Sequence, residues 1–264
     1  MIGTGPRRDA EFDLVVFGAS GFTGRLICER LVERGPEKRL RWAMAGRNEE
    51  KLAAVRKDIG AEDAGLIVAN SDNPASLDAM AARTRAVIAA AGPFQLYGSA
   101  VVAACVANDT DYLDLSGEVV WMRRMIDAHA ETMERGGARI LFSCGFDSVP
   151  FELGVLFLQS TAYSRFGVPV PRAKGRVRRM VGRFSGGTAA SGRATRATAK
   201  REPEVATLLQ DPFCLTPGFE GPAQPDLDQV AFDDDLGAWT APFVMAPINS
   251  RNIHRSHALQ GHRW

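Results

Sequence analysis

The sequence predicts an α/β fold: a doubly wound parallel sheet over the first half, followed by a partial α+β second domain. Apolar segments alternate with amphipathic ones through the first half of the 264 residues. These apolar segments, such as 86–91, are continuous, which is typical of parallel strands covered on both faces. A change of periodicity then sets the boundaries: a loose lead-in over 1–10, a first domain over 11–146 and a second over 147–264.

The first domain is expected to alternate strand and helix. Pro74 lies in the first turn of one expected helix, and Gly136 and Gly137 close the longest one. We expect strands at 12–17, 41–46, 65–69, 86–91, 111–115 and 138–143, with helices at 21–34, 48–58, 74–83, 98–108 and 118–135. In the second domain we expect a buried helix at 149–158, a basic strand at 174–180, a long loop at 211–237 and no closing element over 238–264.

Three glycines spaced three apart follow the first expected strand. Gly18 permits a tight turn, Gly21 lets backbone amides approach a pyrophosphate, and Gly24 lets the next helix lie close to the sheet. The anion would lie at the helix N-terminus, where unpaired N–H groups favour negative charge. The pattern predicts a Rossmann-type dinucleotide site whose phosphate loop contains Gly18, Ala19, Ser20, Gly21, Phe22, Thr23 and Gly24.

The second expected strand indicates which dinucleotide binds. NAD-binding sites usually place an acid after this strand to accept a hydrogen bond from the ribose 2′-hydroxyl. This chain has Arg47 there, with Lys51 one helical turn later. A guanidinium binds a 2′-phosphate through several donors, so the sequence predicts NADP(H) as the cofactor.

Further candidates lie on loops after later strands, where ligands of such folds bind. Asp72 either meets the adenine amine or forms a turn with Pro74. Ala91, Gly92 and Pro93 are expected beside the nicotinamide ribose. The candidate catalytic residues are Tyr97, Ser116 and Asp147; the residues leave open whether Ser116 caps the helix that follows, and Asp147 or Ser148 can cap the next.

Composition excludes several classes of protein. The net charge of +1 implies no strong field for nucleic acid, and no apolar run reaches the ~20 residues of a membrane span. Four scattered cysteines, without a CxxC pair, indicate reduced thiols and a cytoplasmic location. His254 and His257 lack a third ligand, so no metal site is expected.

Two segments of the second half remain ambiguous. The small residues over 182–192 indicate either a helix N-terminus open to a ligand or a flexible turn. A basic run either contacts an acyl-carrier surface or is a solvated strand face, and it comprises Lys174, Arg176, Arg178, Arg179 and Arg183.

Several motifs resemble those of saccharopine dehydrogenase-like oxidoreductases, and within them the bacterial trans-acting enoyl reductase branch. They occur through most of the chain: Gly18-Ala-Ser-Gly-Phe-Thr-Gly24, Ala45-Gly-Arg47, Ala91-Gly-Pro-Phe94, Tyr112-Leu-Asp-Leu-Ser-Gly-Glu118, Gly145-Phe-Asp-Ser-Val-Pro150, Phe184-Ser-Gly-Gly-Thr-Ala-Ala-Ser191 and Met245-Ala-Pro-Ile-Asn249. The resemblance implies an NADP-binding Rossmann domain, a second α+β domain, and reduction of an enoyl double bond in a lipid or polyketide precursor.

The same resemblance implies partners: a synthase served in trans and a substrate that can be carrier-bound. Homo-oligomers and peripheral association with the inner face of the membrane are compatible with it. Two other functions remain open, a saccharopine-type amino-acid oxidoreductase and a non-catalytic NADP(H)-sensing module. Members of the family usually continue beyond the point where this chain stops, so a truncated chain of uncertain activity is expected.

Overall fold

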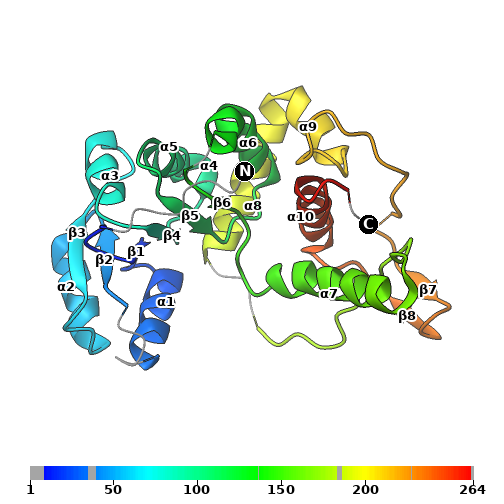
Figure 1. The fold of residues 1–264 in the computed structure, drawn as a ribbon, viewed down its shortest axis with the longest axis horizontal. Helices are drawn as coiled ribbons and strands as arrows, with labels where there is room; N and C mark the ends of the chain where they lie inside the picture. The colour runs from blue at the N-terminus through cyan, green and yellow to red at the C-terminus, as the bar shows by residue number, and fades with distance from the viewer. Residues whose placement is uncertain (1–8, 35–39, 136, 183–185, 227, 263–264) are drawn as a thin grey trace. The chain divides into compact units, whose positions relative to one another are not determined.

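A computed structural model describes residues 9–34, 40–135, 137–182, 186–226 and 228–262 (Figure 1). The chain divides into two compact units. The first comprises Met1–Cys144 and Gly186–Thr195, and the second comprises Gly145–Ser185 and Arg196–Trp264. The sequence placed one boundary near residue 146 and did not anticipate that a later segment joins the first unit.

The first unit contains a six-stranded sheet of order β3-β2-β1-β4-β5-β6, and every pairing in it is parallel. The strand order reverses beside β1, which pairs with β2 on one side and β4 on the other. This is the Rossmann-type doubly wound topology that the sequence predicted. The strands are β1 (Leu14–Phe17), β2 (Trp42–Gly46), β3 (Gly65–Val68), β4 (Ala86–Ala89), β5 (Asp111–Asp114) and β6 (Ile140–Leu141).

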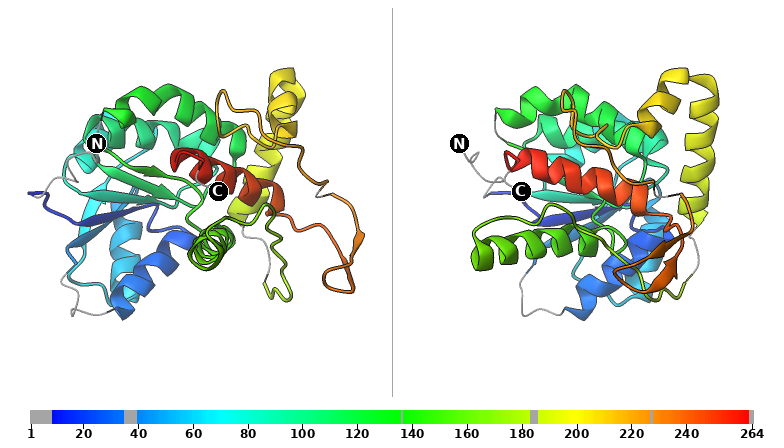
Figure 2. Two further views of the ribbon diagram at one scale, coloured as in Figure 1. Left: turned by 45° about the vertical axis from the view of Figure 1, so that its right-hand side comes forward. Right: turned by 90° about the vertical axis from the view of Figure 1, so that its right-hand side faces the viewer.

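Helices cover both faces of this sheet. Its helices are α1 (Phe22–Glu33), α2 (Glu49–Asp58), α3 (Pro74–Ala81), α4 (Phe94–Tyr97), α5 (Ser99–Ala107) and α6 (Val119–Glu134). Figure 2 shows α1 and α2 on one face and α3, α5 and α6 on the other. Val15, Val16, Met44 and Val87 are therefore fully buried, which explains why the strands read as continuous apolar runs.

Local signals set the helix ends in this unit. The side chain of Asn48 accepts a hydrogen bond from the backbone N–H of Lys51 at the start of α2. Asn73 accepts one from the N–H of Ser76 at the start of α3, where Pro74 lies in the first turn. The expected strands and helices of this half are confirmed, with ends shifted by up to two residues, whereas the short α4 was missed.

The regular secondary structure of the second unit is mostly helical. It contains α7 (Val149–Phe166), the last part of α8 (Gly186–Arg201), α9 (Pro203–Gln210) and α10 (Ala246–Leu259). β7 (Ala231–Asp233) and β8 (Ala238–Thr240) form an antiparallel hairpin. Phe151 of α7 stacks on Phe243 before α10, with ring centroids 5.5 Å apart. Among the described helices, none has the length and apolar character needed to cross a lipid bilayer.

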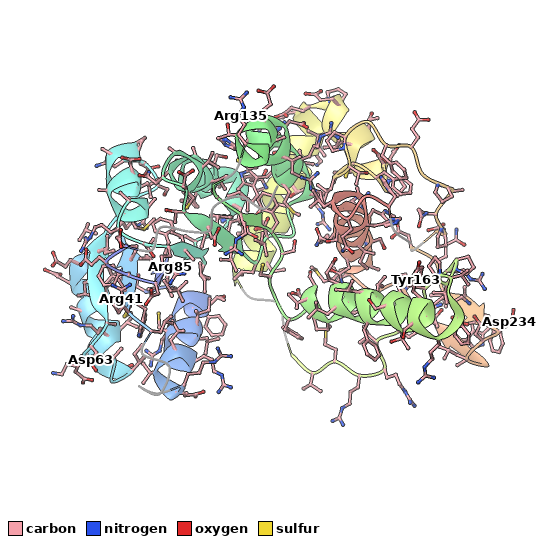
Figure 3. All side chains as sticks on the ribbon, in the orientation of Figure 1. Arg41, Asp63, Arg85, Arg135, Tyr163 and Asp234 are labelled. Carbon is pink, nitrogen blue, oxygen red and sulfur yellow. The ribbon has the colours of Figure 1, made fainter. Side chains whose placement is uncertain are left out.

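The prediction for 149–158 was right about the helix and wrong about burial. Leu153 and Phe157 of α7 are 55% and 73% exposed, and Tyr163 (labelled in Figure 3) is 63% exposed. Apolar composition indicated a core helix, yet α7 buries only one side, at Gln159 and Ala162. Phe151 and Val155 are partly buried, whereas Leu156 and Leu158 are exposed like Leu153 and Phe157.

The expected basic strand at 174–180 is wrong, because this segment pairs with no strand of the described chain. Lys174 and Arg176 instead form ion pairs with the buried Asp233 of β7. Arg178 and Arg179 are exposed, and Arg183 lies outside the described residues.

The expectation of no closing element over 238–264 is also wrong, because β8 and the 14-residue α10 lie there. Pro247 in the first turn of α10 was a helix-start signal that the sequence offered. Within 182–192, α8 begins at Gly186, so the described part is a helix and not a flexible turn. The loop expected at 211–237 is correct except for β7.

Candidate functional site

The phosphate loop owes its shape to two glycines. Gly18 has a φ of +84°, a left-handed conformation, and a Cβ there would lie 2.9 Å from the backbone nitrogen of Ala91. A Cβ on Gly24 would overlap the carbonyl oxygen of Gly18. Only glycine at both positions therefore lets α1 start directly against the turn.

Gly21 differs, because its backbone conformation suits any residue. Its φ is −83°, it is exposed, and a Cβ would meet only the carbonyl oxygen of Gly18 at 3.2 Å. Gly21 lies at the N-terminus of α1, which has no side-chain cap and no acidic residue in its first turn. The first N–H groups of a helix lack intrahelical partners, so this end can bind an anion.

The other residues of the loop differ in exposure. Ala19 is fully buried, and its N–H donates to the carbonyl oxygen of Ala45 at 3.1 Å. Thr23 is half-buried, Ser20 is exposed and Phe22 is 75% exposed. The loop is thus anchored to β2 on one side and open on the other, as an approaching pyrophosphate requires.

Arg47 and Lys51 lie beside the end of β2 and the start of α2. Both side chains are exposed, and neither forms an ion pair with any described residue. The nearest acids, Glu49 and Glu50, lie in the first turn of α2 and not directly after the strand. The two cations therefore remain available for a phosphate.

The opposite edge of the sheet shows the contrast. There Arg41 and Arg85 (both labelled in Figure 3) form ion pairs with Asp13, at 3.0 and 3.4 Å. These ion pairs link the amino-terminal ends of β1, β2 and β4. The arginine at the carboxyl edge, Arg47, has no such function.

Asp72 is exposed after β3. The hydrogen bonds of its turn come from its neighbours: Asn70 accepts from the N–H of Asp72 at 3.2 Å, and Asn73 caps α3. The side chain that accepts a hydrogen bond within this turn is thus that of Asn70, and contact of Asp72 with adenine stays a prediction.

The loop after β4 lies directly against the phosphate loop. The N–H of Ala90 donates to the carbonyl oxygen of Phe17 at 2.8 Å, and Ala91 is the neighbour that Gly18 approaches. Gly92 is exposed, and Pro93 precedes the first turn of α4. The two loops meet where the strand order reverses, the usual ligand position in this fold.

Tyr97 and Ser116, two of the candidate catalytic residues, have different surroundings. Tyr97 ends α4 and is 38% exposed. Ser116 is only 2% exposed; its hydroxyl accepts from the N–H of Glu118 at 3.1 Å, and its carbonyl oxygen accepts from the Ser143 hydroxyl. The Ser116 hydroxyl thus binds the residue before α6 and not an N–H of the helix itself, so neither alternative for Ser116 is decided by this contact.

A buried carboxylate lies at the end of β5. Asp114 is 1% exposed and accepts from the Tyr112 hydroxyl at 3.0 Å and from the N–H groups of Ser116 and Ser143, each at 2.9 Å. Burial raises the pKa of Asp114 to about 7, although the three donors oppose that rise. Sequence reasoning quoted this residue only as part of a loop.

A second buried acid, Glu118, was also missed. It is 5% exposed, and its carboxylate accepts from the N–H groups of Phe94 and Gln95 at 2.8 and 2.9 Å. The hydroxyl of Ser191, in α8, donates to the same carboxylate at 2.6 Å. The partners lie more than 20 and 70 residues away in sequence, so no local pattern signalled this arrangement.

Asp147 lies in the second unit, before α7, and is half-buried. Its carbonyl oxygen accepts from the side-chain amide of Asn249 at 2.8 Å, and the hydroxyl of Ser148 donates to Asn249 at 2.7 Å. α7 has no side-chain cap, so the expected capping by Asp147 or Ser148 is wrong. His254 contacts the carbonyl oxygen of Pro212, and no cluster of three or more metal-binding side chains occurs among the described residues.

Fold and site together define the first unit as a dinucleotide-binding domain, with a glycine-rich loop after β1 and, after β2, two exposed cations that have no ion-pair partner among the described residues. Comparison with known proteins gives the family. Residues 14–141 match the family described as Saccharopine dehydrogenase NADP binding domain. Over residues 14–141 the chain therefore matches an NADP-binding domain of the saccharopine dehydrogenase type, and for this segment the resemblance to saccharopine dehydrogenase-like proteins is confirmed.

Longer relatives match almost the whole chain. A protein named putative trans-acting enoyl reductase, from Mycobacterium tuberculosis, is 41% identical over 94% of this chain and 61% of its own length. One named trans-acting enoyl reductase, from Mycobacterium bovis, is 40% identical over 96% of this chain and 62% of its own. The chain thus spans about three-fifths of the length of these relatives.

Among solved structures, the apo saccharopine dehydrogenase of Saccharomyces cerevisiae is similar with a TM-score of 0.46. The two are 17% identical, over 56% of this chain and 31% of that one. A likeness at this level carries no argument about function.

Proposed function

We propose that this chain is an NADPH-dependent oxidoreductase that reduces the enoyl double bond of a lipid or polyketide precursor, in trans with a synthase. The observation that carries the proposal is the 40–41% identity to trans-acting enoyl reductases over 94–96% of the chain. Such similarity extends well past the NADP-binding domain, into the segments expected to receive substrate.

The residues of the first unit fit the cofactor. We assign the pyrophosphate to the N-terminus of α1 beside Gly21, and the 2′-phosphate to Arg47 and Lys51. Gly92 and Pro93 would lie beside the nicotinamide ribose. The exposed Asp72 would lie beside the adenine. NADPH supplies a hydride, and the chain's own residues orient the double bond, stabilise the enolate and exclude water.

Exposure distinguishes the candidate proton donors within the first unit. Tyr97 is 38% exposed, whereas Ser116 is buried and its hydroxyl already accepts a backbone hydrogen bond. We therefore favour Tyr97 over Ser116, and retain Asp147 of the second unit as a candidate. The substrate would reach the enzyme on a carrier or as a free thioester.

The test is NADPH consumption with enoyl thioesters of increasing chain length, offered both on coenzyme A and on an acyl carrier. Deuterium from labelled NADPH should appear at the β-carbon of the product. Turnover of an amino acid with a keto acid instead would favour the saccharopine-type alternative. NADPH binding without turnover of any substrate would favour the sensing module.

A further inference from the structure

The turn after β4 carries the groups nearest the expected nicotinamide, yet nothing in its own sequence caps it. α4 begins after Pro93, which has no side chain able to accept a hydrogen bond. The backbone N–H groups of Phe94 and Gln95, which have no acceptor within the helix, donate instead to Glu118, one to each carboxylate oxygen. A single buried side chain from the start of α6 therefore fixes the orientation of this turn.

Glu118 also holds a segment from much later in the chain. Ser191 of α8 donates to Oε1, the same oxygen that binds the N–H of Phe94. A second bond reinforces the link, because the side-chain amide of Gln95 donates to the hydroxyl of Thr195 at 3.4 Å. These contacts explain why Gly186–Thr195 belongs to the first unit although its neighbours in sequence do not.

Among the described residues, the donors to Glu118 are two backbone amides and one hydroxyl, all neutral. Burying a carboxylate is costly unless hydrogen bonds replace its hydration, and bonds to a charged acceptor are stronger than neutral ones. Packing also supports the turn, because Trp121 stacks on Phe94 with ring centroids 5.6 Å apart. The position of Tyr97, at the end of the same turn, depends on this support.

We infer that Glu118 is a positioning residue: it holds the turn after β4 and the first part of α8 together, and so shapes the nicotinamide end of the cofactor site. This inference rests on the proposed binding of NADPH by the first unit. It predicts an effect confined to one end of the cofactor, because the phosphate loop and Arg47 make no hydrogen bond to Glu118.

The experiment compares two ligands by calorimetry, NADPH and adenosine 2′,5′-bisphosphate, which lacks the nicotinamide half. Glu118→Gln keeps the shape of the side chain but replaces one accepting oxygen by an NH2 group, which cannot accept from an N–H donor. We therefore expect NADPH to bind about tenfold more weakly. The adenosine ligand should bind within about twofold of the wild type. Ser191→Ala should give a smaller loss of NADPH affinity, and Ser191→Thr, which keeps the hydroxyl, should restore it.

A matched control removes a buried hydrogen bond far from the site. Thr110 is fully buried at the opposite edge of the sheet, and its hydroxyl donates to the carbonyl oxygen of Ala81 at 2.8 Å. Thr110→Val should lower stability and leave the affinities for both ligands unchanged.

Equal losses for both ligands in Glu118→Gln, or no loss in either, would overturn the inference. If Glu118→Gln does not fold, the variants Ser191→Ala and Ser191→Thr provide the test. Identical NADPH affinities of Ser191→Ala and the wild type would then overturn the inference. Failure of the wild type to bind either ligand would instead refute the proposed cofactor, so the two failures are distinguishable.

Discussion

Replacing Asp114 by Asn should make the chain more stable at neutral and alkaline pH. The buried carboxylate accepts three hydrogen bonds, from Tyr112, Ser116 and Ser143, but pairs with no cation among the described residues. Asparagine has nearly the same shape. Its oxygen can accept both N–H bonds, and its NH2 group can donate to the Tyr112 oxygen.

The sign and size follow from the pKa. Burial raises the pKa of Asp114 to about 7, from 3.8, so the folded chain holds this proton more tightly than the unfolded chain. The contribution of protonated Asp114 to the free energy of unfolding is fully present below pH 4 and is lost as the pH rises through 7. At about 1.4 kcal/mol for each pKa unit, ionising Asp114 costs up to about 4 kcal/mol.

Urea unfolding of the wild type and Asp114→Asn, measured from pH 5 to pH 8.5, checks this reasoning. The free energy of unfolding of the variant minus that of the wild type should increase by about 2–4 kcal/mol between pH 5 and pH 8.5. Other titrating groups, such as Glu152 and His254, change both proteins alike and cancel in the difference. A difference that does not vary with pH would refute the argument.

Three further outcomes are expected. Arg47→Asp should weaken NADPH binding by about 1–3 kcal/mol and hardly change NADH binding, and calorimetry showing equal affinity of the wild type for both cofactors would contradict the assignment. Gly21→Val should fold yet lose NADPH, whereas Gly24→Val should lower Tm, because its side chain would overlap the Gly18 carbonyl. Phe157→Asp should reduce self-association in sedimentation, since Phe157 is 73% exposed, and an unchanged sedimentation profile would exclude this surface.

The sequence allowed the first unit to be predicted well because its signals are local. Continuous apolar runs mark the strands, and Asn48 and Asn73 mark helix starts within three residues of their partners. The need for glycine at positions 18 and 24 was also predicted from spacing alone, since Gly18 and Gly24 permit the close approach of α1 to the turn, whereas the role of Gly21 stays a prediction. Each of these features requires only neighbours in sequence and the general geometry of a βα unit.

The second unit was predicted poorly, because composition does not reveal what an apolar segment packs against. Few of its apolar side chains are fully covered in the described chain: Ala162, Val205, Cys214 and Leu215 are among them. Leu153 and Phe157 belong to an apolar helix but lie exposed, and α10, although Pro247 lies in its first turn, was not predicted.

The buried acids show why a candidate site is harder to read than a fold. Asp114 and Glu118 lie four residues apart, and both bind backbone N–H groups of loops that leave the sheet. In such loops the backbone loses its strand or helix partners, and a buried carboxylate replaces them. Burial and a raised pKa therefore do not by themselves make Asp114 catalytic. The residues free to meet a ligand are the ones without internal partners, such as Arg47, and that distinction becomes visible only when the long-range contacts are known.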